Sequence, residues 1–492
     1  MVREVEEIEG IAARDVSVPG FVFGAEGNPA IIPSMKPNRP TVIGRREVLR
    51  LGLVAAGLLA LPPRLLRGAE GRKKRAVVIG AGMAGLGAAR TLHDAGWAVT
   101  VLEARARIGG RVWTDRSLGM PLDLGAQWIE GSTGNPLTAL ARTFGIPTKV
   151  DTDEWLYFGR DGKALSEPAA AAMDELLAEL LERIEAYGET LDRDVSVRRA
   201  VEAVLADEDL TRHQRDIAES FLVGEETTTG ADTESLSLWY GDSADGFPGE
   251  DLLLPGGYGQ VPDHLARGLD VRLEHTVKSV TQDARGVRLQ TSKGPFEADH
   301  CIVTIPLGAL KRDTIAFSPV LPKAKTDAIR RVEFGLLDKV ILVFDKPYWP
   351  RDVDKFAHLA EEQDRYPEFL NWHRYGGQPV LFSYCSGTFA RAMEKRGDAQ
   401  VLAEVMEVVR KMFGARTPAP KKSKVVRWAQ DPFTFGSYSY LPVGATPEHL
   451  DTLAEPFGRV LFAGEATNKD YQATVHGAYL SGLREARRLL AG

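Results

Sequence analysis

The sequence predicts an α/β fold organised around one strand, glycine turn, helix and strand unit. Three observations predict it. Residues 76–79 form a short apolar run, as is typical of a buried strand. The glycine turn GAGMAG follows directly, and a helix-like pattern then continues to about residue 95. A second apolar run ends at Glu103, an acidic residue about 20 positions beyond the glycines.

Composition places the chain among ordinary globular proteins. Its 492 residues are 44% hydrophobic and 26% charged, which excludes a disordered or collagen-like chain and favours two domains. The net charge of −7 argues against a nucleic-acid-binding protein and is compatible with a cationic substrate. Cys301 and Cys385 lie in apolar runs without metal-ligand spacing, so we expect both to be buried and predict no metal site.

The N-terminal segment, residues 1–71, carries features of an export signal. Arg45 and Arg46 precede the apolar run 51–61, a pattern typical of a twin-arginine signal. That run is about half the roughly 20 residues that a membrane helix needs, so we expect no stable membrane span. The sequence therefore predicts export to the periplasm. The alternative is a cytoplasmic protein in which this segment is a helix packed on the fold.

The glycines near residue 80 have the spacing of a dinucleotide-binding turn. Gly80 permits the tight turn, Gly82 lets the backbone approach a pyrophosphate, and Gly85 lets helix and strand pack closely. The helix N-terminus adds free N–H groups and the positive end of its dipole. Glu103 would accept hydrogen bonds from an adenosine ribose and would repel the extra phosphate of NADP. We therefore expect a Rossmann-like domain that disfavours NADP.

A second glycine turn follows, with arginines on both sides. The segment EARARIGGR, residues 103–111, resembles the flavin amine oxidases, in which this turn and its arginine hold the phosphates of FAD. The resemblance implies that FAD is bound by Arg105, Gly110 and Arg111. The segment DLGAQWIEG, residues 123–131, is similar to the family segment that lies along the flavin, which adds Gln127 and Trp128.

A helical block separates these segments from the next glycines. Apolar residues recur at helical spacing between residues 173 and 187, with acidic residues on the other face. We interpret this stripe as a packed core helix. The block extends to about residue 245 and interrupts the nucleotide-binding domain.

Strand patterns return after residue 251. Residues 275–280 resemble a family strand in which the position of Val277 pairs its backbone with the adenine. Residues 299–307 have the length and β-branched content of a buried parallel strand. Residues 334–344 read as one strand that carries Lys339 among apolar neighbours. Burial of a lysine is costly unless it is hydrogen-bonded, and the resemblance implies that Lys339 holds a water at flavin N5.

The C-terminal part extends the resemblance to polyamine oxidases and lysine-specific histone demethylases, over about residues 72–490. It implies that Trp428 packs against the flavin and that Gly464 and Glu465 lie near the flavin pyrophosphate and ribityl chain. Tyr438 would form one wall of an aromatic cage, where an amine can sit against a π-surface. The opposite wall is Thr474, as in the demethylases, and Thr474 also adjoins the cofactor. The role of Tyr471 stays open.

The resemblance also implies the domain layout. A FAD-binding domain is assembled from separated segments, and an α+β substrate-binding domain comes from the insertions between them. The expected FAD-binding segments are residues 72–150, 251–320 and 425–492. The expected substrate-domain segments are residues 151–250 and 321–424.

The function implied is that of a FAD-dependent amine oxidase with non-covalent FAD and oxygen as the electron acceptor. A small amine, we expect a polyamine, would lose a hydride to flavin N5, giving an imine, an aldehyde and hydrogen peroxide. Glu130 matches a glutamate in the substrate tunnel of plant-type polyamine oxidases, so we expect it to bind a distal ammonium. The residues assigned to catalysis are Lys339, Tyr438, Thr474 and Glu130.

Three other functions remain open. An L-amino-acid oxidase or monooxygenase of the same fold would need an arginine for the substrate carboxylate, which the sequence does not identify. A carotenoid-desaturase-like enzyme shares only the front motif. A demethylase-type partner of a basic protein tail would be removed from chromatin by an export signal.

Overall fold

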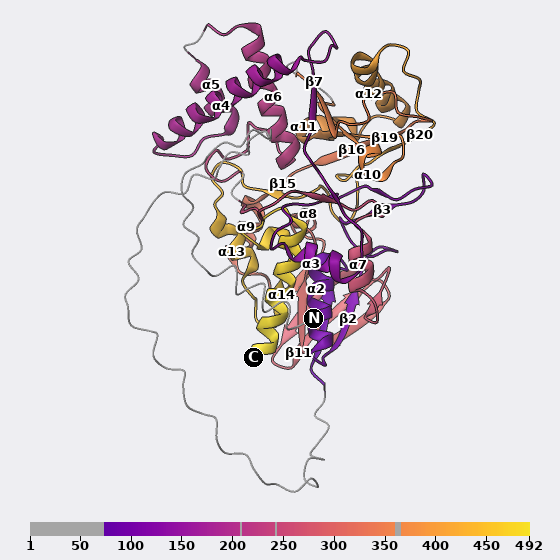
Figure 1. The fold of residues 1–492 in the computed structure, drawn as a ribbon. Helices are drawn as coiled ribbons and strands as arrows, with labels where there is room; N and C mark the ends of the chain where they lie inside the picture. Colours follow the sequence, from indigo (N-terminus) through magenta and orange to yellow (C-terminus); the bar gives the residue numbers. More distant parts are fainter. Residues whose placement is uncertain (1–72, 207–208, 242–243, 360–365) are drawn as a thin grey trace, which may run out of the picture.

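The computed structural model describes residues 73–206, 209–241, 244–359 and 366–492 (Figure 1). The predicted export signal therefore lies outside the described residues. Within them, no helix is both long and apolar enough to cross a membrane. The same part of the chain contains no cluster of three or more histidine, cysteine or acidic residues that could hold a metal ion.

The fold is mixed α/β and contains the predicted unit. Strand β1 (Arg75–Ile79), helix α2 (Met83–Asp94) and strand β2 (Ala98–Leu102) follow one another, and the two strands pair in parallel. They belong to a five-stranded parallel sheet in the order β22-β13-β1-β2-β9. The other members are β9 (Asp270–Arg272), β13 (His300–Val303) and β22 (Val460–Phe462). The parallel strand expected at residues 299–307 is thus confirmed.

Both faces of this sheet are covered, as parallel sheets require. On one face, Val78 and Ile302 pack in a cluster with α2 and with α14 (Val475–Ala491). On the other, Val77 and Cys301 pack with an apolar face of a four-stranded sheet. That sheet consists of β10 (Val277–Asp283), β11 (Gly286–Thr291), β12 (Gly294–Ala298) and β14 (Ala316–Ser318).

A six-stranded sheet lies in the upper part of Figure 1, in the order β20-β16-β19-β18-β17-β7. Its strands are β7 (Trp155–Phe158), β16 (Leu337–Val343), β17 (Lys355–His358), β18 (Glu368–Asn371), β19 (Val380–Ser386) and β20 (Lys422–Val425). All pairs are antiparallel except β7 with β17. One face packs on α12 (Asp398–Phe413) through a shared apolar cluster that also buries Cys385. Both cysteines are buried and free, as expected.

The expectation of one strand over residues 334–344 is wrong. The chain forms a short β15 (Glu333–Phe334), which pairs with β21 (Ser439–Tyr440), and then the separate strand β16. Between them, the N–H groups of Gly335 and Leu336 donate to Tyr438 O and Gly230 O, at 2.7 Å each. A Cβ on Gly335 would lie 2.7 Å from Gly230 O, so the chain bends where only glycine fits.

The expected helical block is confirmed as three helices, α4 (Glu167–Glu189), α5 (Val197–Leu205) and α6 (Arg212–Thr229). Met173, Leu180 and Ile184 of the predicted stripe are buried. Helix α6 begins with a capping box between Thr211 and Gln214 and ends at Gly230 in the left-handed conformation.

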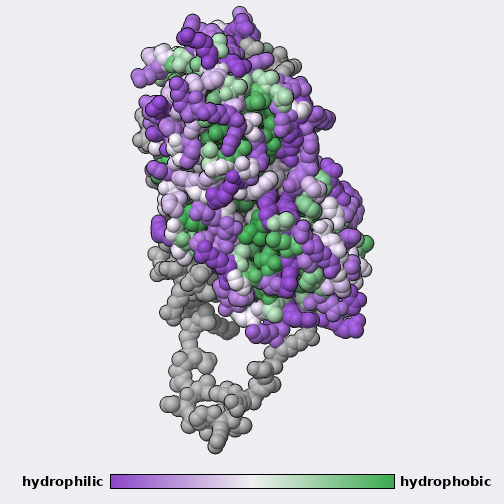
Figure 2. Space-filling view, turned by 90° about the vertical axis from the view of Figure 1, so that its right-hand side faces the viewer, coloured by the Kyte–Doolittle hydropathy of each residue, from purple (hydrophilic) through white to green (hydrophobic). Residues whose placement is uncertain are grey.

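The remaining elements are short connections. They are β3 (Thr114–Asp115), β4 (Leu122–Asp123), β5 (Trp128–Ile129), α3 (Pro136–Thr143), β6 (Lys149–Val150), β8 (Leu252–Leu253), α7 (Gln260–Leu265), α8 (Leu307–Leu310), α9 (Lys323–Arg331), α10 (Trp372–Gly376), α11 (Gly387–Met393), α13 (Pro447–Ala454) and η1 (Glu465–Thr467). The molecule is elongated, and the surface in Figure 2 is mostly hydrophilic with a hydrophobic area in its upper and in its lower part.

Candidate active site

The predicted glycine turn leaves an open backbone surface at the start of α2. A Cβ on Gly85 would lie 2.0 Å from Gly80 O, so this glycine is required by close packing. A Cβ on Gly82 would meet nothing within 4 Å. The second turn approaches the first, because Gly82 and Gly109 form a bridge and Gly109 N donates to Ala81 O at 2.8 Å. The two turns together form a shallow backbone cradle, with Gly110 beside Gly82.

Glu103 lies directly after β2 with its carboxylate turned toward this cradle. Its two oxygens accept hydrogen bonds from Ala81 N at 2.9 Å and from Arg105 N at 2.8 Å. Arg105 is held in turn by Asp431, at 2.6 Å. His275 N donates to Glu103 O at 2.8 Å, which brings the start of β10, and with it the buried Val277, to the same edge. These bonds fix the Glu103 carboxylate at the end of β2.

Arg111 connects two distant segments at the other side of the cradle. Its Nη1 donates to Glu465 Oε1 at 2.9 Å and to Ser437 O at 2.7 Å. The other oxygen of Glu465 accepts from Ser439 Oγ at 2.6 Å. Gly464 adopts φ +141°, and a Cβ there would meet nothing within 4 Å. The guanidinium, the buried carboxylate and an open glycine thus lie together.

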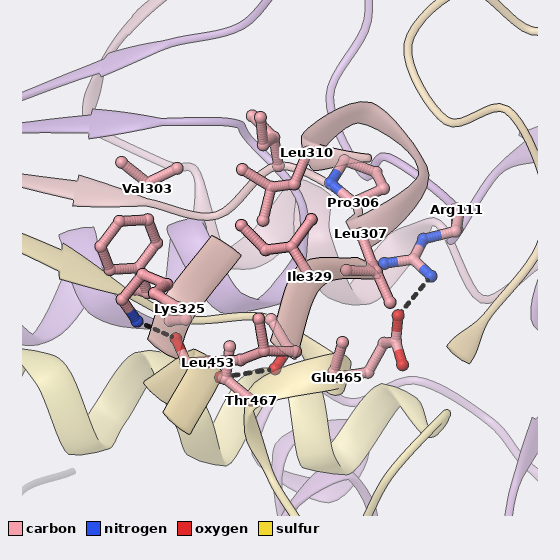
Figure 3. A pocket seen from close by; sticks show the side chains of 15 residues that line it. Arg111, Val303, Pro306, Leu307, Leu310, Lys325, Ile329, Leu453, Glu465 and Thr467 are labelled. Carbon is pink, nitrogen blue, oxygen red and sulfur yellow. Dashed lines mark hydrogen bonds and ion pairs between the residues drawn. The ribbon is translucent and has the colours of Figure 1, made fainter. Parts of the chain in front are cut away.

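A mostly apolar cavity adjoins the Arg111–Glu465 pair (Figure 3). Its lining includes Leu307, Ile329 and Leu453, together with a buried lysine, Lys325. Lys325 Nζ donates to Thr452 O and Leu453 O at 2.8 Å, and burial lowers its pKa to about 8. Because most of the lining is apolar, phosphates fit the open glycine surface at Gly82, and the edge of the cavity at Gly464 and Arg111, better than the apolar part of this cavity.

Lys339 is fully enclosed and uses three donors. Its Nζ donates to Asp123 O at 3.2 Å, to Gly125 O at 2.7 Å and to Gln127 Oε1 at 2.7 Å. Burial lowers the pKa of Lys339 to about 7, opposed by the Asp123 carboxylate. The lysine of β16 thus holds in place the segment that is expected to lie along the flavin.

Trp128 continues that segment and lies between two lysines. The Nζ atoms of Lys339 and Lys355 lie 6.0 and 5.9 Å from its ring centre. Its indole N–H donates to Asp151 Oδ2 at 2.8 Å. Trp428 is more deeply buried, with its indole N–H donating to Leu124 O at 3.1 Å. These bonds fix both tryptophans without a ligand.

Tyr438 and Thr474 both use their hydroxyl groups on the backbone. Tyr438 Oη donates to Thr228 O at 2.9 Å, at the C-terminal end of α6. Thr474 Oγ1 accepts from Gly477 N at 2.9 Å and donates to Tyr471 O at 2.9 Å, so it caps α14. The phenol ring and the threonine methyl group are therefore the surfaces that each residue can offer to a substrate.

Glu130 lies two residues beyond Trp128 and is accessible, with 55% of its side chain exposed. It raises the pKa of the Tyr438 phenol, together with burial as the larger cause. Its Oε2 lies 4.0 Å from His476 Nδ1, which is too far for a hydrogen bond. Burial lowers the pKa of His476 to about 4, so the imidazole is neutral near pH 7.

Three rings beside Glu130 were not assigned from the sequence. Phe247 and Tyr471 stack with centroids 4.9 Å apart and planes 5° apart. His476 contacts both edge to face, at 5.2 and 5.1 Å. The sequence singles out Tyr471, but no local pattern indicates Phe247 as its partner, more than 200 residues away. The site therefore combines an accessible carboxylate with aromatic surfaces, which suits a cation.

The described residues fit a bound flavin dinucleotide. The backbone is open at Gly82 and Gly464, as a pyrophosphate requires, and Glu103 stands at the end of β2 for a ribose. Gln127 Nε2 is buried and has no hydrogen-bond partner among the described residues, so one amide donor remains for a ligand. The donor set is suited to FAD.

Comparison with known proteins settles the family. The family model described as flavin containing amine oxidoreductase matches residues 83–490. The chain belongs to this family. Its cofactor is therefore FAD.

Members of this family with different names are about equally similar to the chain. Lysine-specific histone demethylase 1 homolog 1 of Oryza sativa subsp. japonica is 34% identical over 440 residues, covering 84% of this chain and 52% of that protein. Polyamine oxidase 2 of Arabidopsis thaliana is 34% identical over 431 residues, covering 84% of this chain and 88% of that protein. The chain thus spans about half the length of the demethylase relatives and most of the polyamine oxidase.

The fold is also that of a solved oxidase. A structure of putrescine oxidase with bound putrescine aligns with a TM-score of 0.71 at 22% identity, covering 86% of this chain and all of that one. At this identity the likeness concerns the fold alone.

Proposed function

We propose that this flavin amine oxidase acts on a polyamine. The observation that carries the proposal is the position of Glu130, an exposed carboxylate two residues beyond Trp128 and beside the rings of Phe247, Tyr471 and His476. The same segment provides the acceptors of Lys339, so the carboxylate and the lysine are joined by a short and rigid stretch of chain. A polyamine carries a second charge for Glu130 while another nitrogen reacts.

The chemistry follows from the cofactor and from the way the chain surrounds it. Gly82, Glu103 and Gly464 would hold FAD, which would supply the oxidation of the carbon next to the amine, with oxygen as the electron acceptor and hydrogen peroxide as a product. The protein orients the amine between Tyr438 and Thr474 and holds Gln127 through Lys339. Lys339 would hold a water next to the flavin on exchanging one of its three protein acceptors for that water. The reacting nitrogen must be neutral, so the rate rises with pH through its apparent pKa.

The roles assigned to the FAD-binding residues rest on the same family resemblance and are part of this proposal. The division of the chain into a FAD-binding domain of three segments and a substrate domain of two segments is also part of this proposal. The five-stranded sheet supports it, because residues 72–150, 251–320 and 425–492 each contribute strands to that sheet. Export by the twin-arginine route remains a proposal from the N-terminal sequence.

The test is an oxygen-consumption screen of the purified yellow protein. Spermine, spermidine and putrescine should be oxidised with release of hydrogen peroxide, whereas simple monoamines and L-amino acids should react at least about 10-fold more slowly by kcat/KM. Faster oxidation of an L-amino acid than of every polyamine would contradict the proposal.

A demethylase-type activity is the second candidate. It is favoured by the 34% identity to a protein named as a lysine-specific histone demethylase. A methyl-lysine peptide belongs in the same screen, with formaldehyde as the measured product. Oxidation of the peptide in preference to all polyamines would favour this second function.

A further inference from the structure

A row of polar residues starts at Lys339 and crosses one face of the six-stranded sheet. Lys339 lies opposite Tyr384 in the antiparallel register of β16 and β19. On the next strand Phe369 lies opposite Ser383, so the preceding residue, Glu368, lies opposite Tyr384. Residues directly opposite in antiparallel strands point to the same face. Lys339, Tyr384 and Glu368 therefore share a face, and Glu368 lies two strands, or about 10 Å, from Lys339.

This face of the sheet meets the candidate active site. Lys339 Nζ and Tyr384 Oη both donate to Gln127 Oε1, at 2.7 and 3.1 Å. The ring centre of Trp128 lies 6.1 Å from that of Tyr384. Glu368 is therefore the next side chain along the row beyond two residues that contact the segment expected along the flavin.

The carboxylate of Glu368 is partly buried. Within the described part of the chain it makes no hydrogen bond or ion pair. Burial raises the pKa of Glu368 to about 7. The charge of Lys355 opposes this rise in pKa, and the charge of Asp153 adds to it. The nearby cation does not complete the pair, because Lys355 Nζ is held by Asp153 and by Asp151, the latter at 3.0 Å. A partly buried carboxylate without a partner among the described residues is unfavourable, so an incoming cation would be bound favourably here.

We propose that Glu368 is a specificity-determining residue that binds a substrate ammonium distant from the nitrogen being oxidised. This rests on the proposed function and deepens it. Tyr384 lies next to Glu368 on one side. On the other side Ala357 lies opposite Glu368, and Tyr157 lies opposite Ala357 on the strand after that. Glu130 lies on a different segment, beside His476. A triamine or tetramine would therefore meet two separate carboxylates.

The test compares two amines of the same carbon chain, octamethylenediamine and octylamine. Glu368→Gln should raise KM for the diamine by about 10-fold to 100-fold, the worth of one charge-assisted hydrogen bond, and leave KM for the monoamine unchanged. Glu154→Gln is the matched control, because it makes the same charge change near the same sheet at a side chain that is 59% exposed. Glu154→Gln should leave KM unchanged for both the diamine and the monoamine.

Binding to the dithionite-reduced holoenzyme separates this proposal from the proposed function. The reduced enzyme cannot oxidise the ligand, so calorimetric titration measures affinity alone. The unsubstituted protein should bind the diamine at least about 10-fold more tightly than the monoamine, and Glu368→Gln should remove that difference. Glu368→Asp keeps the charge and should retain part of the difference in affinity between diamine and monoamine. Flavin content checks that each variant is folded.

The outcomes are distinct. A diamine preference that depends on Glu368 supports the proposal, even if the active protein oxidises neither amine, in which case only the proposed function is wrong. Equal losses on diamine and monoamine overturn the role of Glu368, as does a diamine preference that survives Glu368→Gln. Binding of neither amine, with flavin present, overturns both.

Discussion

Lys339 and Tyr384 donate hydrogen bonds to the same oxygen, Gln127 Oε1, from neighbouring strands of one sheet. Two donors on one oxygen fix the orientation of the amide, so that its Nε2 is left without a partner among the described residues. A lysine, a tyrosine and a glutamine from three parts of the sequence thus present one unused donor at the site. The first prediction concerns the lysine of this group.

Lys339→Met should slow flavin reduction or flavin reoxidation by about 10-fold to 1000-fold while FAD stays bound, because one positioned polar contact is lost. Stopped-flow absorbance of the flavin measures both half-reactions. Lys424→Met is the control, since Lys424 lies on the adjacent strand β20 but pairs with Asp115 at 2.6 Å. Unchanged half-reactions in Lys339→Met would remove this lysine from the site.

Glu130→Gln should lower kcat/KM for spermidine by about 10-fold or more, because an ion-paired hydrogen bond to a second charge is worth roughly 1.5 to 3 kcal/mol. A monoamine such as benzylamine should be much less affected. Steady-state oxygen consumption with both substrates measures this, and the exposed neighbour Glu250 provides the control Glu250→Gln. Equal losses on both substrates would contradict a role for Glu130 in recognition.

FAD should be released by acid precipitation, because no covalent link holds it. In monoamine oxidases the residue before the cage tyrosine is a cysteine that bonds the flavin, whereas Ser437 stands here. Ser437 Oγ is already engaged with the backbone N–H and C=O of Leu337, at 2.9 Å each. Absorbance of the supernatant and of the pellet measures the outcome, and a yellow pellet would show the prediction wrong.

Two alanine substitutions should separate folding from cofactor binding. Gly85→Ala should destabilise the fold by about 1 to 3 kcal/mol or more, because its Cβ would lie 2.0 Å from Gly80 O. Gly82→Ala has open space and φ −82°, so it should fold normally but bind FAD at least about 10-fold more weakly. Thermal melts and flavin fluorescence after dialysis measure the two effects. Normal FAD retention in folded Gly82→Ala would place the pyrophosphate elsewhere.

The neutral buried His476 predicts a specific pH dependence of stability. Its pKa falls from 6.5 to about 4 on folding, so between these values the unfolded chain binds a proton that the native chain does not. Stability should therefore be unaffected by this group above pH 6.5 and should decline as the pH falls from 6.5 to 4, by about 3 kcal/mol in total. Urea unfolding across this window should show a smaller decline for His476→Gln. An equal decline in both proteins would mean that His476 is protonated in the native state.

The sequence predicted those parts of the molecule whose signals are local. The strand, glycine turn, helix and strand unit is contiguous, so its spacing could be read directly, and Glu103 followed from it. The break at Gly335 was missed because it depends on a contact with Gly230, more than 100 residues away. The position of Glu368 depends on the register of β18 against β19, which no pattern within either strand specifies. The ring stack of Phe247 on Tyr471 also depends on tertiary contacts, so no local pattern in the sequence indicates it.

The strand order β22-β13-β1-β2-β9 also constrains how the chain can fold. Strand β1 pairs with β13 more than 200 residues later, and β13 in turn pairs with β22 close to the C-terminus. Pairings this distant in sequence make folding slow, because loop closure is required before the contacts are gained. The sheet remains incomplete until residues 460–462 have been synthesised. During translation the apolar edge of β13 is therefore exposed, and a truncated chain that lacks β22 should aggregate rather than form a smaller flavoprotein.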